Sequence, residues 1–262
     1  MMTTQKPTPF HGKVAIVTGA ATGIGRATAM LLAEQGASVI VADRNLIEGT
    51  QTAQLIQEAG GIAHFQQVDV SLGNEVQQMM ESVRQRHGKL DILINNAAVQ
   101  ILGTLVDTSE ESWDRIHNVN LKGVFLCCKY AIPLMIGKQG AAIVNVASVL
   151  GIVADPGLTA YCAAKGGVIS LTRAAALTYG PQGIRINCIC PGDVETQLVK
   201  EYFESNPDPQ AFRQQVYSNY ALKRIAYPLE IAKSIAFLAS DAASFISGSS
   251  LVIDGGLTVK CY

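Results

Sequence analysis

Short runs of β-branched residues alternate with longer helical stretches along most of this 262-residue chain. The runs are apolar throughout, which is typical of strands covered by helices on both faces. The stretches between them carry apolar residues at i, i+3 and i+4, the spacing of amphipathic helices. This alternation predicts βαβ units and therefore one doubly wound parallel sheet. The seven predicted strands are Val14–Val17, Ser38–Val41, Ile62–Val68, Ile92–Ile94, Ile143–Val146, Ile184–Ile189 and Leu251–Ile253.

Helix signals lie between these strands. The clearest helical patterns cover Gly25–Gln35, Glu75–Arg86 and Trp113–Ile136. Thr108 and Glu111 have the spacing of a capping box ahead of the third pattern, within which Trp113 is expected to pack in the core. Pro228 is predicted to begin a further helix in its first turn. The region Gln197–Leu222 is expected to be the least regular part of the chain.

The composition indicates a single, well-packed domain. Hydrophobic residues make up 48% of the chain and charged residues 16%, while the formal net charge is −1. That charge offers no basic surface for nucleic acid or anionic membrane. No apolar run has the roughly 18 residues of a membrane span, and the polar start lacks the apolar core of a signal peptide. We therefore expect a flexible leader over residues 1–12, one Rossmann-type domain over residues 13–262, and a cytoplasmic protein.

The cysteines and histidines give no sign of a metal site. None of the six cysteines forms a C-x-x-C pair, and no two histidines have ligand spacing. We interpret the cysteines as small, reduced core residues. The histidines are expected to be structural or exposed; they are His11, His64, His87 and His117.

A glycine-rich turn follows the first predicted strand. Residues 18–25 read T-G-A-A-T-G-I-G and lead into a helix. Glycines permit a tight turn and a close approach of the backbone to a pyrophosphate, and a helix N-terminus attracts phosphate. Such glycines can also serve packing alone. In the first βαβ unit, the turn favours a dinucleotide site at Gly19, Thr22, Gly23 and Ile24.

An acidic residue at the end of the second strand indicates which dinucleotide binds. Asp43 stands 18 residues after Gly25, where a carboxylate can accept hydrogen bonds from the adenosine ribose and repel a 2′-phosphate. The glycine turn offers Ala21 and Thr22 rather than a basic residue. Arg44 could meet a phosphate, but it adjoins Asp43 rather than replacing it. The sequence therefore favours NAD over NADP.

The glycine turn resembles the T-G-x-x-x-G-x-G motif of the short-chain dehydrogenase/reductase family. Further family motifs follow in order: Asp69 and Val70 after the third strand, Asn95 to Ala98 as N-N-A-A in place of N-N-A-G, Pro191 to Thr196 as P-G-x-x-x-T, and Asp254 to Gly256 as D-G-G. Ala98 is tolerable in place of glycine if its φ is negative. The resemblance implies coenzyme contacts from Gly19, Thr22, Gly23, Ile24, Asp43, Arg44, Asp69, Val70, Asn96, Ala97, Ala98, Tyr161, Lys165, Pro191, Gly192, Val194 and Thr196.

Tyr161 and Lys165 resemble the family's Y-x-x-x-K pair, thirteen residues after Ser148. Residues four apart on a helix share a face, so the ammonium can lie near the phenol and favour its ionisation. Lowering the tyrosine pKa from about 10 by roughly three units corresponds to about 4 kcal/mol. Tyr161 is then expected to act as general acid and base at working pH.

Two more residues complete the implied catalytic set. Ser148 ends the fifth strand, where its hydroxyl can hold the substrate oxygen. Asn120 matches the asparagine of the family's central helix, which implies that it holds a water that relays protons through Lys165. Asn118 is expected to point elsewhere, to the surface or to a cap.

The resemblance implies an NAD-linked oxidoreductase that moves hydride between a secondary alcohol and nicotinamide. Polar residues favour a sugar or polyol: Gln100, Asp155 and Asp193 join Ser148 and Tyr161 as candidate substrate contacts, with residues 197–222 as a substrate loop. A 3-oxoacyl thioester or steroid ketoreductase is the alternative enzyme. A non-catalytic NAD-binding regulator is a further alternative, although such a protein would be expected to lose some catalytic residues. The family also implies a homotetramer that pairs the helices around Trp113–Met135 and Thr159–Thr178.

Overall fold

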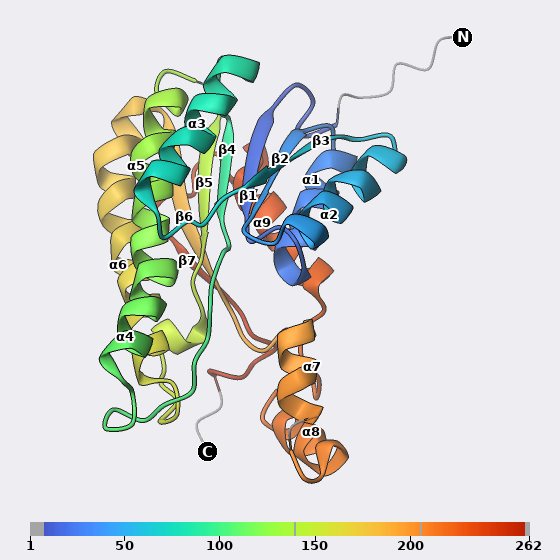
Figure 1. Cartoon of the computed structure of the whole chain (residues 1–262), viewed down its shortest axis with the longest axis vertical. Coiled ribbons are helices and arrows are strands. Elements are labelled where there is room, and N and C mark those ends of the chain that lie inside the picture. Colours follow the sequence, from blue (N-terminus) through green and yellow to red (C-terminus); the bar gives the residue numbers. More distant parts are fainter. Residues whose placement is uncertain (1–7, 139, 205, 260–262) are drawn as a thin grey trace.

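A single parallel sheet of seven strands forms the centre of the computed structural model, which describes residues 8–138, 140–204 and 206–259 (Figure 1). The strand order is β3-β2-β1-β4-β5-β6-β7. The predicted doubly wound sheet is confirmed. The strands are β1 (Val14–Thr18), β2 (Ser38–Asp43), β3 (Ile62–Gln67), β4 (Ile92–Asn95), β5 (Ala141–Val146), β6 (Ile184–Pro191) and β7 (Ser250–Ile253).

The direction of winding reverses between β1 and β4. The chain builds β1, β2 and β3 outward in one direction and then returns to place β4 on the other side of β1, with Ile16 paired to Leu93. Open α/β sheets bind ligands at the carboxyl ends of the strands beside such a reversal. The topology therefore points to the segments that follow β1 and β4.

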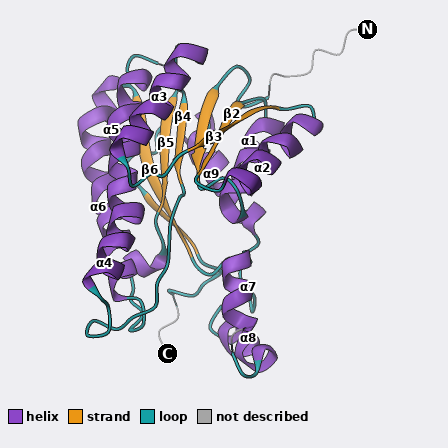
Figure 2. Ribbon diagram, in the orientation of Figure 1, coloured by secondary structure: helices purple, strands orange, loops and turns teal. Residues whose placement is uncertain are grey.

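Helices cover both faces of the sheet (Figure 2). Each face of the sheet has its own hydrophobic cluster. Successive side chains of a strand point to opposite faces, so Ile16 belongs to one cluster and Ala15 and Val17 belong to the other. On one face lie α1 (Gly23–Glu34), α2 (Leu46–Glu58) and α9 (Pro228–Ala239). On the other lie α3 (Gly73–His87), α4 (Glu110–His117), α5 (Gly123–Met135) and α6 (Thr159–Tyr179). As predicted, Pro228 begins α9.

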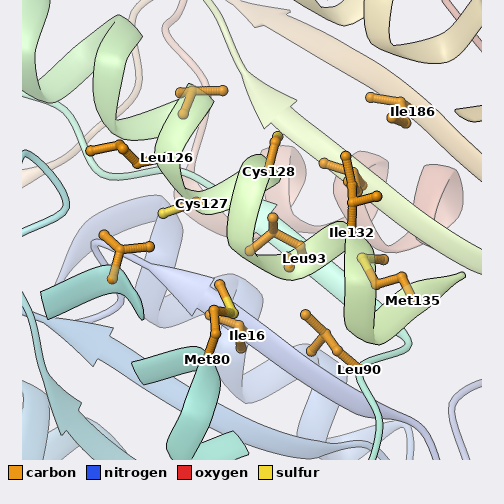
Figure 3. Packing of buried hydrophobic residues seen from close by; sticks show 14 of the residues in the cluster. Ile16, Met80, Leu90, Leu93, Leu126, Cys127, Cys128, Ile132, Met135 and Ile186 are labelled. Carbon is orange, nitrogen blue, oxygen red and sulfur yellow. The ribbon is translucent and has the colours of Figure 1, made fainter. Parts of the chain in front are cut away.

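Figure 3 shows the packing against β1 and β4 on the second face. Ile16 and Leu93 contribute from the strands, Met80 from α3 and Met135 from α5, all at most 3% exposed. Burial of side chains of this size contributes about 1.5–3 kcal/mol each. Cys128 lies in the same cluster, and burial raises the pKa of its thiol to about 12. All five cysteines in the described ranges are free; four are buried as predicted, Cys162 is only partly buried, and Cys261 lies outside the described residues.

The folded part of the chain begins earlier than predicted. Phe10 is 1% exposed, and its backbone N–H donates to the carbonyl of Gln35 at 3.0 Å. Residues 8–12 thus pack on the end of α1, whereas residues 1–7 of the expected leader lie outside the described residues. Among the described residues, no helix combines the length and apolar character that crossing a bilayer requires.

The predicted start of the central helix is wrong by one residue. Ser109 is the N-cap of α4, with its Oγ accepting from the Ser112 N–H at 3.1 Å, while Thr108 donates to the carbonyl of Thr104. Trp113 is 38% exposed and stacks on His117 rather than packing in the core. The face of α4 turned inward presents Ile116 instead, which is fully buried.

The central helix is interrupted where one continuous helix was predicted. A π-helical turn, η1 (Asn118–Lys122), separates α4 from α5. Such turns insert one extra residue into an α-helix and frequently occur at functional sites. This turn contains Asn120, which is fully buried, whereas Asn118 is partly exposed as expected.

The region predicted to be irregular contains two helices, α7 (Gln197–Glu204) and α8 (Pro209–Ser218). They extend beyond the carboxyl edge of the sheet (Figure 1). Pro209 occupies the first turn of α8, and Asp208 caps that turn by accepting from the Ala211 N–H at 3.0 Å. Pro209, one of the residues that suggested irregular structure, therefore marks a helix start. A small cluster around Phe203, Tyr220 and Ile225 holds the two helices together.

Candidate active site

The glycine turn after β1 packs against the end of β4. A Cβ on Gly19, whose φ is +63°, would lie 2.7 Å from the Cα of Ala97. A Cβ on Gly25 would lie 2.0 Å from the carbonyl oxygen of Gly19. The Asn96 amide donates to the carbonyls of Thr18 and Gly19, both at 3.0 Å. Only glycine fits these positions, and the turn is fixed to the N-N-A-A segment.

The N-terminus of α1 lies open at this turn. Thr22 is the N-cap residue, and no described side chain caps the helix. The first N–H groups of an uncapped helix carry partial positive charge and suit an anion such as phosphate. A Cβ on Gly23 would lie 3.1 Å from the methyl group of Thr196. Two predicted coenzyme motifs, 173 residues apart, therefore face each other.

An open cavity lies at the carboxyl ends of β1, β2, β3 and β4, with about 490 Å³ of empty space that includes open solvent. Its walls are mostly apolar and bear three charged side chains. Seven of the predicted coenzyme residues line it: Gly19, Asp43, Arg44, Asp69, Val70, Ala97 and Ala98. Ala98 is not among the described residues with positive φ, so alanine is unstrained there. An apolar cavity with an acidic rim beside an open helix N-terminus fits the adenosine part of a dinucleotide.

Asp43 is held rigidly at the rim of this cavity. Its Oδ2 accepts from the Ala21 N–H and its Oδ1 from the Asn45 N–H, both at 2.9 Å. These two backbone donors fix the direction of the carboxylate. Arg44 lines the same cavity with an exposed side chain. The cavity thus carries both an acid and a base.

Ser148, which follows β5, converges with Tyr161 and Lys165 in the first turns of α6. The Nζ of Lys165 lies 5.5 Å from the centroid of the Tyr161 ring and donates to the carbonyl of Val146 at 2.7 Å. Ser148 and Lys165 are buried, whereas Tyr161 is partly exposed. Ser148 lowers the pKa of Tyr161, so these two side chains are also near each other. Three of the four predicted catalytic side chains, those of Ser148, Tyr161 and Lys165, therefore lie together.

The pKa values differ from the sequence prediction. The dense surrounding protein raises the pKa of Tyr161 to about 12, against a lowering by the hydrogen bond from Ser148. The negative charge of Asp193 raises it further. Desolvation also lowers the pKa of Lys165 to about 8. The predicted lowering of the Tyr161 pKa is wrong for the chain without coenzyme, because desolvation by the surrounding protein raises the pKa more than Ser148 lowers it.

Asn120 connects the π-turn to the N-N-A-A segment. Its Oδ1 accepts from the Val99 N–H and its Nδ2 donates to the Val99 carbonyl, both at 2.8 Å. The side chain is fully buried and both of its polar atoms are engaged. Asn120 therefore fixes the loop that follows β4.

The segment after β6 is held at the same edge of the sheet. The Gly192 N–H donates to the carbonyl of Ile253 at 3.1 Å, and a Cβ on Gly192 would lie 3.1 Å from the Tyr220 ring. Val194 is 5% exposed and forms an isolated bridge with Ala226. Pro191, Gly192, Val194 and Thr196 thus lead from β6 toward the glycine turn.

The three polar candidates for substrate contact, Asp193, Asp155 and Gln100, have different surroundings in the structure. Asp193 accepts a hydrogen bond from the Tyr220 hydroxyl at 2.7 Å, and its charge acts on Tyr161. Asp155 accepts from the Gly157 N–H at 2.7 Å, which makes it a loop-forming residue, although its charge raises the pKa of Asp193. Gln100 is exposed and has no hydrogen bond among the described residues.

Several positioning residues were missed by sequence reasoning. Thr18 accepts from the N–H groups of Asn96 and Ala97 at 3.0 and 3.1 Å, which joins β1 to the loop after β4. Asn145 accepts from Asn95 at 2.8 Å and donates to Thr172 at 2.9 Å. A buried asparagine in the middle of an apolar strand was the available signal for Asn145, because such a group requires a partner. Tyr220 gave no comparable signal.

Comparisons with known proteins agree with this arrangement. A family described as enoyl-(acyl carrier protein) reductase matches residues 19–258. The chain is 41% identical over 251 residues to meso-2,3-butanediol dehydrogenase of Serratia marcescens, covering 96% of each. It is 39% identical over 254 residues to cyclohexanol dehydrogenase of an Acinetobacter species, covering 96% of this chain and 97% of the relative. It is also 39% identical over 253 residues to a 3-oxoacyl-[acyl-carrier-protein] reductase of Thermotoga maritima, covering 95% and 99%.

Solved structures give the same result. The aldohexose dehydrogenase of Thermoplasma acidophilum superimposes with a TM-score of 0.87 at 34% identity, over 98% of each chain. A Burkholderia xenovorans protein described as a short-chain dehydrogenase/reductase superimposes with a TM-score of 0.93 at 34% identity, over 97% of this chain and 100% of the other. With its glycine turn, its serine, tyrosine and lysine and these relatives, the chain belongs to the short-chain dehydrogenase/reductase family.

Proposed function

We propose that this chain is an NAD-dependent dehydrogenase that oxidises a secondary alcohol to a ketone, with Tyr161 as general acid and base. The observation that carries the proposal is the convergence of Ser148, Tyr161 and Lys165, with the Lys165 Nζ 5.5 Å from the Tyr161 ring centroid. The names of the butanediol and cyclohexanol dehydrogenase relatives support the substrate class.

The coenzyme would lie along the edge from the cavity beside Asp43 to Tyr161. Gly19, Thr22, Gly23 and Ile24 would hold its pyrophosphate, and Asn96, Ala97, Gly192 and Thr196 would hold the nicotinamide half. When bound, nicotinamide supplies the hydride acceptor; the protein supplies position and electrostatics.

Three side chains handle the substrate proton. The Ser148 hydroxyl donates a hydrogen bond to the substrate oxygen and stabilises negative charge that develops there. Tyr161 removes the alcohol proton in oxidation and returns it in reduction. Lys165 has its pKa lowered to about 8, so its amine can exchange protons near working pH. Asn120 fixes the loop above these residues and supports a proton path from Lys165 to solvent.

Several contacts favour NAD over NADP. Asp43 is fixed by two backbone amides at the cavity rim, where its charge would repel a 2′-phosphate. The nearby Arg26 donates to the carbonyl of Ala21 and the hydroxyl of Thr52 and pairs with Glu48, so it is engaged within the protein. Arg44 is the one basic side chain that lines the described cavity, and its backbone follows directly on Asp43.

The helices α7 and α8 would cover the substrate, as proposed for residues 197–222. They join the sheet through the segment that carries Asp193 and Thr196. The position of the two helices would therefore affect the binding of both the coenzyme and the substrate. The chain would assemble as a homotetramer, which exposed apolar side chains support: Phe125 on α5 is 48% exposed, Leu177 on α6 81%, and Phe245 is fully exposed. Sedimentation as a monomer would contradict this assembly.

Absorbance of NADH at its nicotinamide band tests the proposal. Purified chain with NAD⁺ is expected to oxidise members of a panel of cyclic alcohols, diols, polyols and hydroxy acids. Tyr161→Phe is expected to abolish that turnover while NADH fluorescence titration still reports binding. Binding of NADH with no turnover of any panel member would instead favour a non-catalytic regulator.

A further inference from the structure

Asp193, at the mouth of the proposed site, is anchored through both its backbone and its side chain. Its N–H donates to the Tyr220 hydroxyl at 2.8 Å, and its carbonyl accepts from the Ala226 N–H at 3.0 Å. Its Oδ2 in turn accepts a hydrogen bond from the Tyr220 hydroxyl at 2.7 Å. Because Tyr220 is itself 2% exposed and packs on Gly192, the carboxylate has one fixed direction.

The second carboxylate oxygen of Asp193 is unused. Its Oδ1 accepts no hydrogen bond from any residue that the structure describes, and the side chain is exposed. A residue needed only to hold Tyr220 would require one oxygen, and that oxygen is Oδ2. Oδ1 therefore remains available to a hydrogen-bond donor from outside the chain.

The carboxylate acts on the reacting centre of the proposed mechanism. Its negative charge raises the pKa of Tyr161, so the two groups are electrostatically coupled. Desolvation by surrounding protein and the charge of Asp155 both raise the pKa of Asp193 itself, against a lowering by Tyr220. The charge of Asp193 opposes ionisation of Tyr161, and a donor bound at Oδ1 would reduce that opposition.

We propose that Asp193 is a specificity residue whose free carboxylate oxygen accepts a hydrogen bond from a second hydroxyl group of the substrate. The enzyme would then prefer diols and polyols to mono-alcohols and would disfavour anionic hydroxy acids. This inference rests on the proposed dehydrogenase function and names its substrate class.

Physical chemistry sets the size of the preference. A hydrogen bond to a charged acceptor contributes more than one between neutral groups, and sites that hydrogen-bond a substrate hydroxyl reject analogues that lack it. Because the Asp193 side chain is exposed, water can replace a missing hydroxyl, so the preference is moderate. We expect kcat/KM for a diol to exceed that for its mono-alcohol by about 10- to 100-fold.

The test compares matched substrates in matched variants. The substrates are butane-2,3-diol with butan-2-ol, cyclohexane-1,2-diol with cyclohexanol, and the anion 3-hydroxybutanoate. The variants are Asp193→Asn, Asp193→Ala and Tyr220→Phe, with Asp114→Asn as a carboxylate-to-amide control on the exposed surface of α4. NADH fluorescence titration establishes that each variant is folded and binds coenzyme.

The proposal predicts a change in the ratio of kcat/KM for a diol to kcat/KM for its mono-alcohol. Both Asp193 variants should lower the diol to mono-alcohol ratio of kcat/KM by at least 10-fold and improve use of 3-hydroxybutanoate relative to butan-2-ol. Tyr220→Phe keeps the charge of Asp193 but removes the hydroxyl that orients the carboxylate, so it should lower the diol to mono-alcohol ratio by a smaller factor than the Asp193 variants, and Asp114→Asn should not change that ratio.

Other outcomes would overturn the inference. An unchanged diol to mono-alcohol ratio in both Asp193 variants would show that Asp193 only anchors Tyr220. With 3-aminobutan-2-ol as a further substrate, a preference of the wild type for it over butane-2,3-diol would show that the site selects a cation instead. If the wild type oxidises no alcohol at all with NAD⁺, the proposed function fails; if it oxidises diols and mono-alcohols equally well, only the role of Asp193 fails.

Discussion

The ammonium of Lys165 lies over the ring of Tyr161, 5.5 Å from its centroid, and gives a hydrogen bond to the carbonyl of Val146. The carbonyl fixes the amine in a buried position, and the amine faces the aromatic group that the proposed mechanism uses. Lys165 is thus a buried residue of α6 and also a member of the candidate active site.

Replacement of Tyr161 by phenylalanine should remove the acid and base while keeping the ring beneath Lys165. Positioned general acids and bases contribute about 10²- to 10⁴-fold, so kcat should fall by at least that factor. Stopped-flow or steady-state NADH absorbance measures the loss. Ser148→Ala serves as a comparison and should also reduce kcat, because the substrate oxygen loses its donor.

Stability should depend on pH through Lys165. Its pKa is about 8 in the folded chain, below the ordinary lysine value of 10.5, so the unfolded chain binds more protons between these two values. The free energy of unfolding should therefore rise with pH across this window, by up to about 3 kcal/mol from this group. Urea titrations at pH 7.5, 9 and 10.5 measure it. Lys165→Met should lose this part of the slope; an equal slope in both proteins would contradict the assignment.

Asp43 should control the choice between NADH and NADPH. Asp43→Asn removes the charge but keeps an oxygen that can accept from the Ala21 N–H, so the turn should keep its shape. Loss of a unit charge beside the 2′-phosphate should strengthen NADPH binding by about 10-fold, whereas NADH should bind slightly more weakly. Fluorescence titration with both coenzymes measures this. Tighter binding of NADPH than NADH by the wild type would refute the NAD preference.

Gly25→Ala should disrupt the glycine turn, because the new Cβ would lie 2.0 Å from the carbonyl oxygen of Gly19. We expect loss of NADH binding and a lower melting temperature, since backbone has to move. Gly180→Ala is the matched control, because its Cβ would meet no atom within 4 Å and its φ is not positive. Equal melting temperatures and equal NADH affinities for the two variants would contradict the close packing.

The sequence predicted the sheet well because each strand is short, apolar and separated from the next by helix-forming residues. Parallel strands bring their carboxyl ends to one edge, so motifs at strand ends could be placed together without coordinates. The lining of the cavity by Gly19, Asp43, Asp69 and Ala97 follows from that rule.

The predictions that were wrong concern features that depend on the direction of a side chain or on competition between neighbouring residues for the same role. Thr108 and Ser109 can both cap α4, and the sequence does not show which hydroxyl meets a free N–H. One residue inserted at the π-turn around Asn120 shifts only the phase of the apolar pattern, and the eight residues of α4 are too few to show that shift. The direction of the Tyr161 pKa shift depends on the balance of burial against charge, which only the coordinates provide.

The π-turn over Asn118–Lys122 sets a limit on how this chain can be stabilised. Deleting one residue there would let α4 and α5 merge into a regular α-helix, with better backbone geometry throughout. The same deletion would rotate Asn120 away from Val99 and release the loop after β4. A change chosen only to raise the melting temperature would thus straighten the helix and displace Asn120. The π-turn should therefore be left unchanged when this chain is engineered for stability.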